Sequence, residues 1–348
     1  MAQPSSYRCE VCGAVNQDNA VLCLSCNHPL LTFIPPVSAP LLPNTLFNDR
    51  YHIISKVGTG GYASVYKATD TRRGGRLVAV KEVSLRELEP RAVIEASGTF
   101  YREVSFLSQL THAGLPRTYE YCRTPEHLYL VMEYIEGETL EEYQIRAYAR
   151  HKYFPLSEVL TIGIQLCSVL DYLHTHQPPI VFRDLKPANI MRTFQGQLYL
   201  IDFGIARHFK PGQAKDTIAL GSLGYAAPEQ YGKAQTTPRA DIYSLGAVLH
   251  QLLTAEDPSE APFHFTPLRV NSYQSLSRLG ILIEQMVEMD ARKRPASVAV
   301  IKQELQHIAT VWKAAMVNFW QPGPQHTHSP EATMGTYQAG YRAVKSPV

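Results

Sequence analysis

Residues 181–189 have the sequence VFRDLKPAN, residues 198–204 have the sequence LYLIDFG, and these two segments decide the fold. The first contains Asp184, with Lys186 and Asn189 shortly after it. The second is an apolar run that ends in Asp202. Such a run predicts a buried strand, and a buried strand would hold the carboxylate that follows it in a fixed position.

The chemistry that these four polar side chains could perform together is phosphoryl transfer. An aspartate can accept a hydroxyl proton, a lysine can neutralise phosphate charge, and an asparagine and a second aspartate can bind a divalent metal. A surface loop rich in Asp and Asn is the simpler explanation, and a lone D-F-G would deserve it. The compound pattern D-L-K-P-x-N followed by D-F-G does not fit that explanation.

These motifs resemble the catalytic and metal-binding loops of protein kinases, specifically the bacterial eukaryotic-like serine/threonine kinases. The resemblance covers roughly residues 50–308 and implies a two-lobed α+β fold with a small β-rich lobe and a larger helical lobe. It also implies a serine/threonine protein kinase that uses ATP and Mg²⁺. By resemblance, Asp184 is the catalytic base and Lys186 contacts the γ-phosphate. Asn189 and Asp202 then bind two magnesium ions.

Three positions depart from the family pattern. Phe182 replaces the histidine of H-R-D, and we expect activity to survive because a phenylalanine can fill the same internal apolar stack. Ala63 replaces the third glycine of the glycine-rich loop, where a small residue keeps the path of the backbone. Ser222 stands where a threonine usually supports the catalytic site, and it keeps the hydroxyl.

A glycine-rich segment, residues 58–65, follows an apolar run that predicts a strand. Glycines let backbone amides approach phosphates, although a lone glycine-rich loop is often only a hairpin turn. A second apolar run leads to Lys81, which shares one face of its strand with Ala79. The ATP-binding residues implied by the resemblance are Gly58, Thr59, Gly60, Gly61, Val65, Ala79, Lys81, Met132, Glu133 and Ile135.

A helix is predicted over residues 100–110, because Phe100, Val104 and Leu107 fall on one face. Glu103 neighbours that face. On spacing alone, Glu103 is equally consistent with an exposed helix position and with a buried carboxylate that needs a partner. By resemblance it pairs with the catalytic Lys81.

The activation segment is expected between residues 204 and 227. The presence of Arg183 is typical of kinases whose segment is ordered when an arginine pairs with a phosphate. Thr217 and Ser222 are the nearby hydroxyls, and we predict that Thr217 is autophosphorylated. The resemblance also implies three structural residues, the ion pair Glu229–Arg294 and the bracing Asp241.

Four of the six cysteines form two C-x-x-C pairs, Cys9 with Cys12 and Cys23 with Cys26. Two such pairs can close a tetrahedral thiolate site, so they predict a zinc ribbon at residues 1–28 with a structural Zn²⁺. Two disulfides are an alternative that a cytosolic setting disfavours. A redox motif is another, although such motifs usually occur singly on a larger scaffold.

The expected organisation is a ribbon at residues 1–28, a proline-rich linker at 29–46, a kinase domain at 47–312 and a disordered tail at 313–348. Five prolines between residues 29 and 43 predict a semi-rigid spacer rather than a packed element. We therefore expect zinc binding to be only loosely coupled to kinase activity. A protein partner of the ribbon is also expected.

Composition narrows the function classes. The formal net charge is +2, with basic residues scarce in the ribbon, so we do not expect nucleic-acid binding. No run approaches the eighteen or so apolar residues of a membrane span, and the N-terminus has no apolar signal core. A cytoplasmic protein that acts in signalling on ATP and on protein substrates is expected.

Two other functions compete with an active kinase. A pseudokinase scaffold would bind nucleotide or partner proteins without catalysis, and Phe182 and Ala63 are its only support. Pseudokinases usually lose the base, the lysine or the metal-binding aspartate, and this sequence retains them. A nucleic-acid binder led by the ribbon is the third hypothesis.

Overall fold

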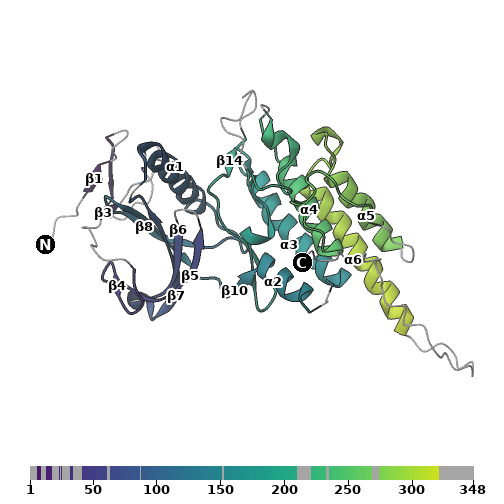
Figure 1. Cartoon of the computed structure of the whole chain (residues 1–348), viewed down its shortest axis with the longest axis horizontal. Helices are drawn as coiled ribbons and strands as arrows, with labels where there is room; N and C mark the ends of the chain where they lie inside the picture. The colour runs from purple at the N-terminus through teal and green to yellow at the C-terminus, as the bar shows by residue number, and fades with distance from the viewer. Residues whose placement is uncertain are drawn as a thin grey trace, which may run out of the picture.

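The computed structural model describes most of the chain between residues 41 and 320 and short pieces before it. The described residues are 6–8, 13–17, 23, 25, 32–33, 41–60, 63–86, 88–150, 153–209, 221–232, 235–268 and 274–320. Figure 1 shows two lobes, with the long strands of the first part of the chain at one end and helices α2 to α6 at the other. The predicted two-lobed α+β fold is confirmed.

The small lobe is built on a seven-stranded sheet of order β3-β8-β9-β7-β6-β5-β4, antiparallel except between β3 and β8. Successive side chains of a strand point to opposite faces. Val78 and Val80 therefore join an apolar cluster on one face, while Ala79 and Lys81 lie on the other. The strands are β3 Thr32–Phe33, β4 Leu46–Phe47, β5 Tyr51–Gly60, β6 Ala63–Asp70, β7 Arg76–Ser84, β8 Thr118–Arg123 and β9 His127–Glu133.

Helix α1, Pro90–Leu107, is the helix of the small lobe. It begins ten residues before the predicted range of 100–110 and ends three residues before the end of that range. Proline is well suited to the first turn of a helix, where its missing N–H costs nothing. The apolar period that predicted the helix starts only at Phe100, because Ala96 is the single buried residue in the preceding turns of α1.

Described parts of the predicted spacer at residues 29–46 contact the small-lobe sheet. Strand β3 pairs in parallel with β8, strand β4 pairs with β5, and Leu41 is buried in the apolar cluster that includes Tyr51. A proline removes only its own backbone donor. The pairing residues Thr32 and Phe33 precede Pro35, so the prolines do not prevent these contacts.

The N-terminal cysteines lie mostly outside the described residues. Strands β1, Ser6–Arg8, and β2, Val15–Gln17, form an antiparallel hairpin around the first pair. Cys9, Cys12 and Cys26, three of the predicted zinc ligands, are not among the described residues. Cys23 is described and is fully buried.

The large lobe packs helices around one apolar core. Helix α4 is buried along almost its whole length, and the apolar stripe of α3 faces the same core. The helices are α2 Leu140–Tyr148, α3 Leu156–His174, α4 Arg239–Thr254, α5 Gln274–Met286 and α6 Val298–Trp320. The short elements are η1 Thr71–Arg73, β10 Gly137–Thr139, β11 Ile180–Val181, η2 Pro187–Asn189, β12 Ile190–Thr193, β13 Leu198–Leu200, β14 Arg207–His208, η3 Pro228–Tyr231 and η4 Ala291–Lys293.

Two helices differ from the sequence expectations. Helix α6 continues to Trp320, past the predicted end of the domain at residue 312. Helix α3 has a mean hydropathy of 1.4 and is long and apolar enough to cross a membrane on length and composition alone. Ten of its residues are buried in the core of the lobe, as expected for a core helix.

Candidate active site

Lys81 and Glu103 form a buried ion pair between β7 and α1. The Lys81 Nζ lies 2.5 Å from the Glu103 Oε2, and Glu103 is only 2% exposed. Glu103 is therefore not an exposed helix position. Burial raises the pKa of Glu103. Burial opposes the charge of Lys81, but attraction to Glu103 and Asp202 outweighs it and the pKa of Lys81 is raised. The pair holds an ammonium group in place on the inner face of the sheet.

Asp202 approaches the same ammonium group from the large lobe. Its Oδ1 lies 3.8 Å from the Lys81 Nζ and accepts the Gly204 N–H at 3.2 Å. The residue follows β13 and has a left-handed φ of 67°, while its side chain is about half exposed. The predicted strand therefore ends in an accessible carboxylate beside Lys81.

The hairpin of β12 and β13 joins the two aspartates, as predicted. The Asn189 Nδ2 donates to the Asp184 carbonyl at 2.9 Å and to the Asp184 Oδ2 at 2.7 Å. The Ile201 N–H donates to the Asn189 carbonyl at 2.9 Å, which ties the second loop to the first. With its amide nitrogen committed to Asp184, Asn189 keeps its amide oxygen for a cation. Carboxylate and amide oxygens are the ligands that Mg²⁺ prefers, so Asn189 and Asp202 fit this ion.

Ser222 connects the activation segment to the catalytic loop. Its hydroxyl donates to the Asp184 Oδ1 at 2.7 Å and accepts from the Lys186 Nζ at 2.6 Å. The Lys186 Nζ also lies 3.3 Å from the Asp184 Oδ2. Serine therefore both donates a hydrogen bond to Asp184 and accepts one from Lys186. Thr217 lies outside the described residues.

Two buried groups hold the catalytic loop. The Asp241 carboxylate accepts the backbone N–H groups of Phe182 and Arg183 at 2.8 and 2.7 Å and contacts the His174 Nε2 at 2.8 Å. The Phe182 ring is fully buried and packs edge-on against the Phe203 ring, with 5.0 Å between centroids. Phenylalanine thus fills the position of the family's histidine with an apolar contact to the D-F-G segment.

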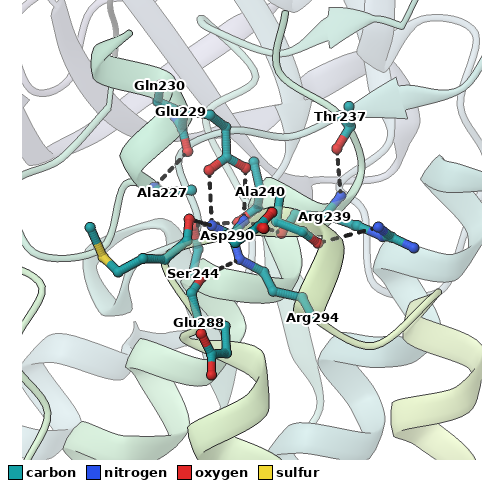
Figure 2. Close-up of polar contacts among 12 residues, drawn as sticks. Ala227, Glu229, Gln230, Thr237, Arg239, Ala240, Ser244, Glu288, Asp290 and Arg294 are labelled. Atoms are coloured by element: carbon teal, nitrogen blue, oxygen red, sulfur yellow. Dashed lines mark hydrogen bonds and ion pairs between the residues drawn. The ribbon is translucent and has the colours of Figure 1, made fainter. Parts of the chain in front are cut away.

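The Glu229–Arg294 ion pair joins η3, which directly follows the activation segment, to the residue after η4, and Figure 2 shows both side chains. The Arg294 Nη1 and Nη2 bind the two Glu229 oxygens at 2.7 and 2.9 Å. The Arg294 side chain is fully buried and also donates to the backbone carbonyls of Glu288 and Arg239.

The residues expected to bind ATP lie on adjacent strands of the small-lobe sheet. Gly58 pairs with Val65 and Val65 with Lys81, which aligns three of them across β5, β6 and β7. Ala79 pairs with Met132 across β7 and β9. Thr59 and Gly60 end β5, Glu133 ends β9, and Ile135 is buried just after it, whereas Gly61 lies outside the described residues.

Three further side chains, which no sequence motif indicated, contact residues of the site. Arg102 donates to the Gly204 carbonyl at 2.5 Å, His174 contacts Asp241, and Gln230 donates to the Arg183 carbonyl at 2.9 Å. Each contact joins positions 47 or more residues apart. No local period or spacing marks such residues.

Comparisons with known proteins agree with this geometry. The family described as "Protein kinase domain" matches residues 51–307. The chain is 34% identical over 216 residues to the probable serine/threonine-protein kinase PknB of Lactococcus lactis, covering 61% of this chain and 33% of that protein. It is 37% identical over 212 residues to the serine/threonine-protein kinase PrkC of Bacillus subtilis, covering 61% and 31%.

A longer match extends to a cyanobacterial protein. The chain is 31% identical over 301 residues to serine/threonine-protein kinase A of Synechocystis, covering 78% of this chain and 56% of that protein. The chain thus spans about a third of the length of the first two relatives and just over half of the third.

Proposed function

This chain belongs to the protein kinase family, and from that membership we propose that it transfers the γ-phosphate of ATP to serine and threonine hydroxyls of proteins. The observation that carries the proposal is the contact set at Asp184. One carboxylate oxygen meets Ser222, the other meets Asn189, and Lys186 is 3.3 Å away. A base, a phosphate-binding cation and a metal-binding amide are thus gathered at one point.

In the proposed reaction, Asp184 orients the substrate hydroxyl and accepts its proton as the hydroxyl oxygen bonds to the γ-phosphorus. The bond from that phosphorus to the bridging oxygen breaks, and ADP leaves with the electron pair. Lys186 neutralises charge on the transferred group, and Lys81, held by Glu103, binds the other phosphates. Mg²⁺, held by Asn189 and Asp202, would supply further charge neutralisation.

A pseudokinase scaffold gains no support from the described residues. Phe182 is accommodated by its packing against Phe203, and Lys81 and Glu103 are paired. Ala63 opens β6 without interrupting its pairing with β7.

The test is transfer of γ-labelled phosphate from ATP, with magnesium, to the protein itself and to a generic Ser/Thr substrate. We expect incorporation by the wild type and none by Asp184→Asn. Absence of transfer by the wild type, with ATP still bound tightly, would favour the scaffold function instead.

We also propose that Thr217 becomes phosphorylated and that arginines, Arg183 first among them, receive the phosphate. Burial and the positive charge of Arg207 lower the pKa of Arg102 on α1, so a phosphate bound by both arginines would relieve this repulsion. Two neighbouring cations attract a dianion. Phosphopeptide mapping of active protein would find phosphate at Thr217, and its absence between residues 209 and 222 would refute the assignment.

For the N-terminus we propose a zinc ribbon with Cys9, Cys12, Cys23 and Cys26 as ligands and a protein as its partner. In support, the Cys23 Sγ accepts the Ser25 N–H at 3.4 Å, a contact that stabilises a thiolate. One zinc per chain by elemental analysis, lost in a variant with all four cysteines changed to serine, is the expected result. Full metal content in that variant would contradict it.

The organisation of the chain and its location follow from the same proposal. We retain a ribbon at residues 1–28 and a kinase domain from residue 47, and we place the protein in the cytoplasm, where reduced thiols can bind zinc. Coupling between the two parts should be closer than the linker's composition suggested, because β3 and Leu41 pack on the small lobe. Cell fractionation tests the location. The kinase rate of a chain that starts at Asn44, compared with that of the full chain, tests the coupling.

A further inference from the structure

Gln230 lies at the junction between the catalytic loop and the end of the activation segment. It belongs to η3, directly after the A-P-E motif, and is 2% exposed. Its Oε1 accepts the Ala227 N–H at 3.0 Å, as Figure 2 shows. Its Nε2 donates to the Arg183 carbonyl at 2.9 Å. One buried amide therefore bridges two segments that are 47 residues apart.

The backbone that Gln230 holds is in an unfavourable conformation. Arg183 has a φ of 72°, in the left-handed region that residues with a Cβ rarely adopt. Such a conformation persists only where the surroundings hold it. The Arg183 N–H donates to Asp241 on α4 and the Arg183 carbonyl accepts from Gln230, so buried side chains hold both ends of this residue.

The held carbonyl belongs to the peptide bond that leads into Asp184. Because a peptide is planar, fixing its oxygen fixes the orientation of its N–H and of the Cα that follows. Asp184 has its own contacts, to Ser222 and Asn189 through its carboxylate and to Asn189 through its backbone carbonyl, but none of them reaches the peptide bond that precedes it. Gln230 is thus the side chain that fixes the peptide plane from which Asp184 extends.

The space around the amide supports this function. A Cβ on Gly221 would lie 2.9 Å from the Gln230 Nε2 and 2.5 Å from the Ala226 Cβ. Only glycine leaves the amide room to reach Arg183. Gly221 directly precedes Ser222, so the residue that admits the amide neighbours the hydroxyl that binds Asp184.

We propose that Gln230 is a positioning residue for phosphoryl transfer, which holds the Arg183–Asp184 peptide so that the Asp184 carboxylate meets the substrate hydroxyl. The inference rests on the kinase activity proposed above. Gln230 acts through Asp184 and touches neither substrate nor nucleotide.

The first test is Gln230→Met, which keeps the length of the side chain and removes both hydrogen bonds. Misplacement of a catalytic group by about 1 Å can cost on the order of a hundredfold in rate. We expect kcat to fall by about tenfold to a hundredfold with KM for ATP unchanged, since no nucleotide contact is lost. Gln109→Met is the matched control, because Gln109 is exposed just after α1 and its side chain bonds only Ser105 among the described contacts.

The second test is Gln230→Glu, which separates the two hydrogen bonds. A carboxylate still accepts the Ala227 N–H but repels the Arg183 carbonyl, whereas a protonated carboxyl can donate to it. Burial and the neighbouring Glu229 and Asp241 favour the protonated form, while the Arg183 guanidinium and Arg294, bound to Glu229, oppose it. We expect the ratio of the variant's kcat to the wild-type kcat to rise as the pH falls from about 8.5 to 6.

The outcomes separate this inference from the proposed function. A wild type that transfers no phosphate defeats the function itself. An active wild type matched by Gln230→Met, or a loss of kcat that only follows the fraction unfolded in a thermal melt, overturns the positioning role. If Gln230→Met does not fold, the test rests on Gln230→Glu. A ratio of its kcat to the wild-type kcat that does not change with pH would then overturn the positioning role. A lowered kcat with native melting behaviour and a ratio that rises at low pH supports it.

Discussion

Arg294→Met should destabilise the large lobe strongly, because it removes the cation that neutralises Glu229. The Arg294 side chain is fully buried, binds both Glu229 oxygens and lies over the Tyr243 ring, 5.0 Å from its centroid. Methionine can replace the stem but not the guanidinium. It would leave Glu229, with only 15% of its side chain exposed, without its cation, and it would leave the backbone carbonyls of Glu288 and Arg239 without this donor.

The expected magnitude follows from this burial. Breaking a buried ion pair by removing one partner costs about 3–5 kcal/mol. In a domain of this size each kcal/mol corresponds to a Tm change of about 2–4 °C, so the Tm should fall by roughly 6–20 °C. Circular dichroism during heating measures the shift, and urea unfolding gives the matching loss of free energy.

Arg292→Met is the matched control, because Arg292 lies two positions away and its side chain is 87% exposed. That variant should melt like the wild type. In the double variant Glu229→Gln/Arg294→Met, the loss should be smaller than the sum of the two single losses, since each single variant leaves one charge of the pair buried and unpaired and the double variant leaves none. The reasoning fails if Arg294→Met melts within about 2 °C of the wild type.

Three further predictions test other contacts. Arg50 holds the pKa of Asp70 below its ordinary value through two hydrogen bonds, so their stabilisation is present above about pH 4 and is lost as the pH falls through the lowered pKa; Arg50→Met should therefore lose less stability than the wild type between pH 5 and 3 in urea unfolding, and an equal loss would refute this. Ser222→Ala should lower kcat about tenfold or more while Ser222→Thr keeps it, as measured by phosphate transfer, because only the first removes the hydroxyl bound to Asp184 and Lys186. Leu41→Ala should cost about 2–5 kcal/mol in urea unfolding while Leu42→Ala costs little, since Leu41 is 4% exposed and Leu42 is 53% exposed; equal costs would mean that this segment does not pack on the sheet.

The parts of the site that sequence could predict are those carried by short motifs. The spacing of Asp184, Asn189 and Asp202 indicated two loops joined by a hairpin, and the hairpin is present. The apolar run before Asp202 indicated a strand, and β13 ends just before it. Local patterns sufficed because these residues are close in sequence.

Contacts between distant segments could not be predicted. Spacing left Glu103 undecided between an exposed and a buried position, and only the packing of α1 against β7 buries it. Gln230 and His174 follow no period that would separate them from other polar residues. The proline content of residues 29–46 indicated a spacer, because composition does not reveal that Thr32 and Phe33 reach a strand edge some ninety positions later.

That reach has a consequence for the order in which the protein is made. Thr32 leaves the ribosome long before its partner Cys122 is synthesised. Residues 32–33 therefore remain unpaired while β5 to β8 are made. Closing such a long loop is slow relative to forming the local hairpins. During translation the nascent small lobe therefore has an open edge at β8 until β3 pairs with it. An N-terminal fusion that hinders β3 would prolong that exposure and should lower the yield of folded protein.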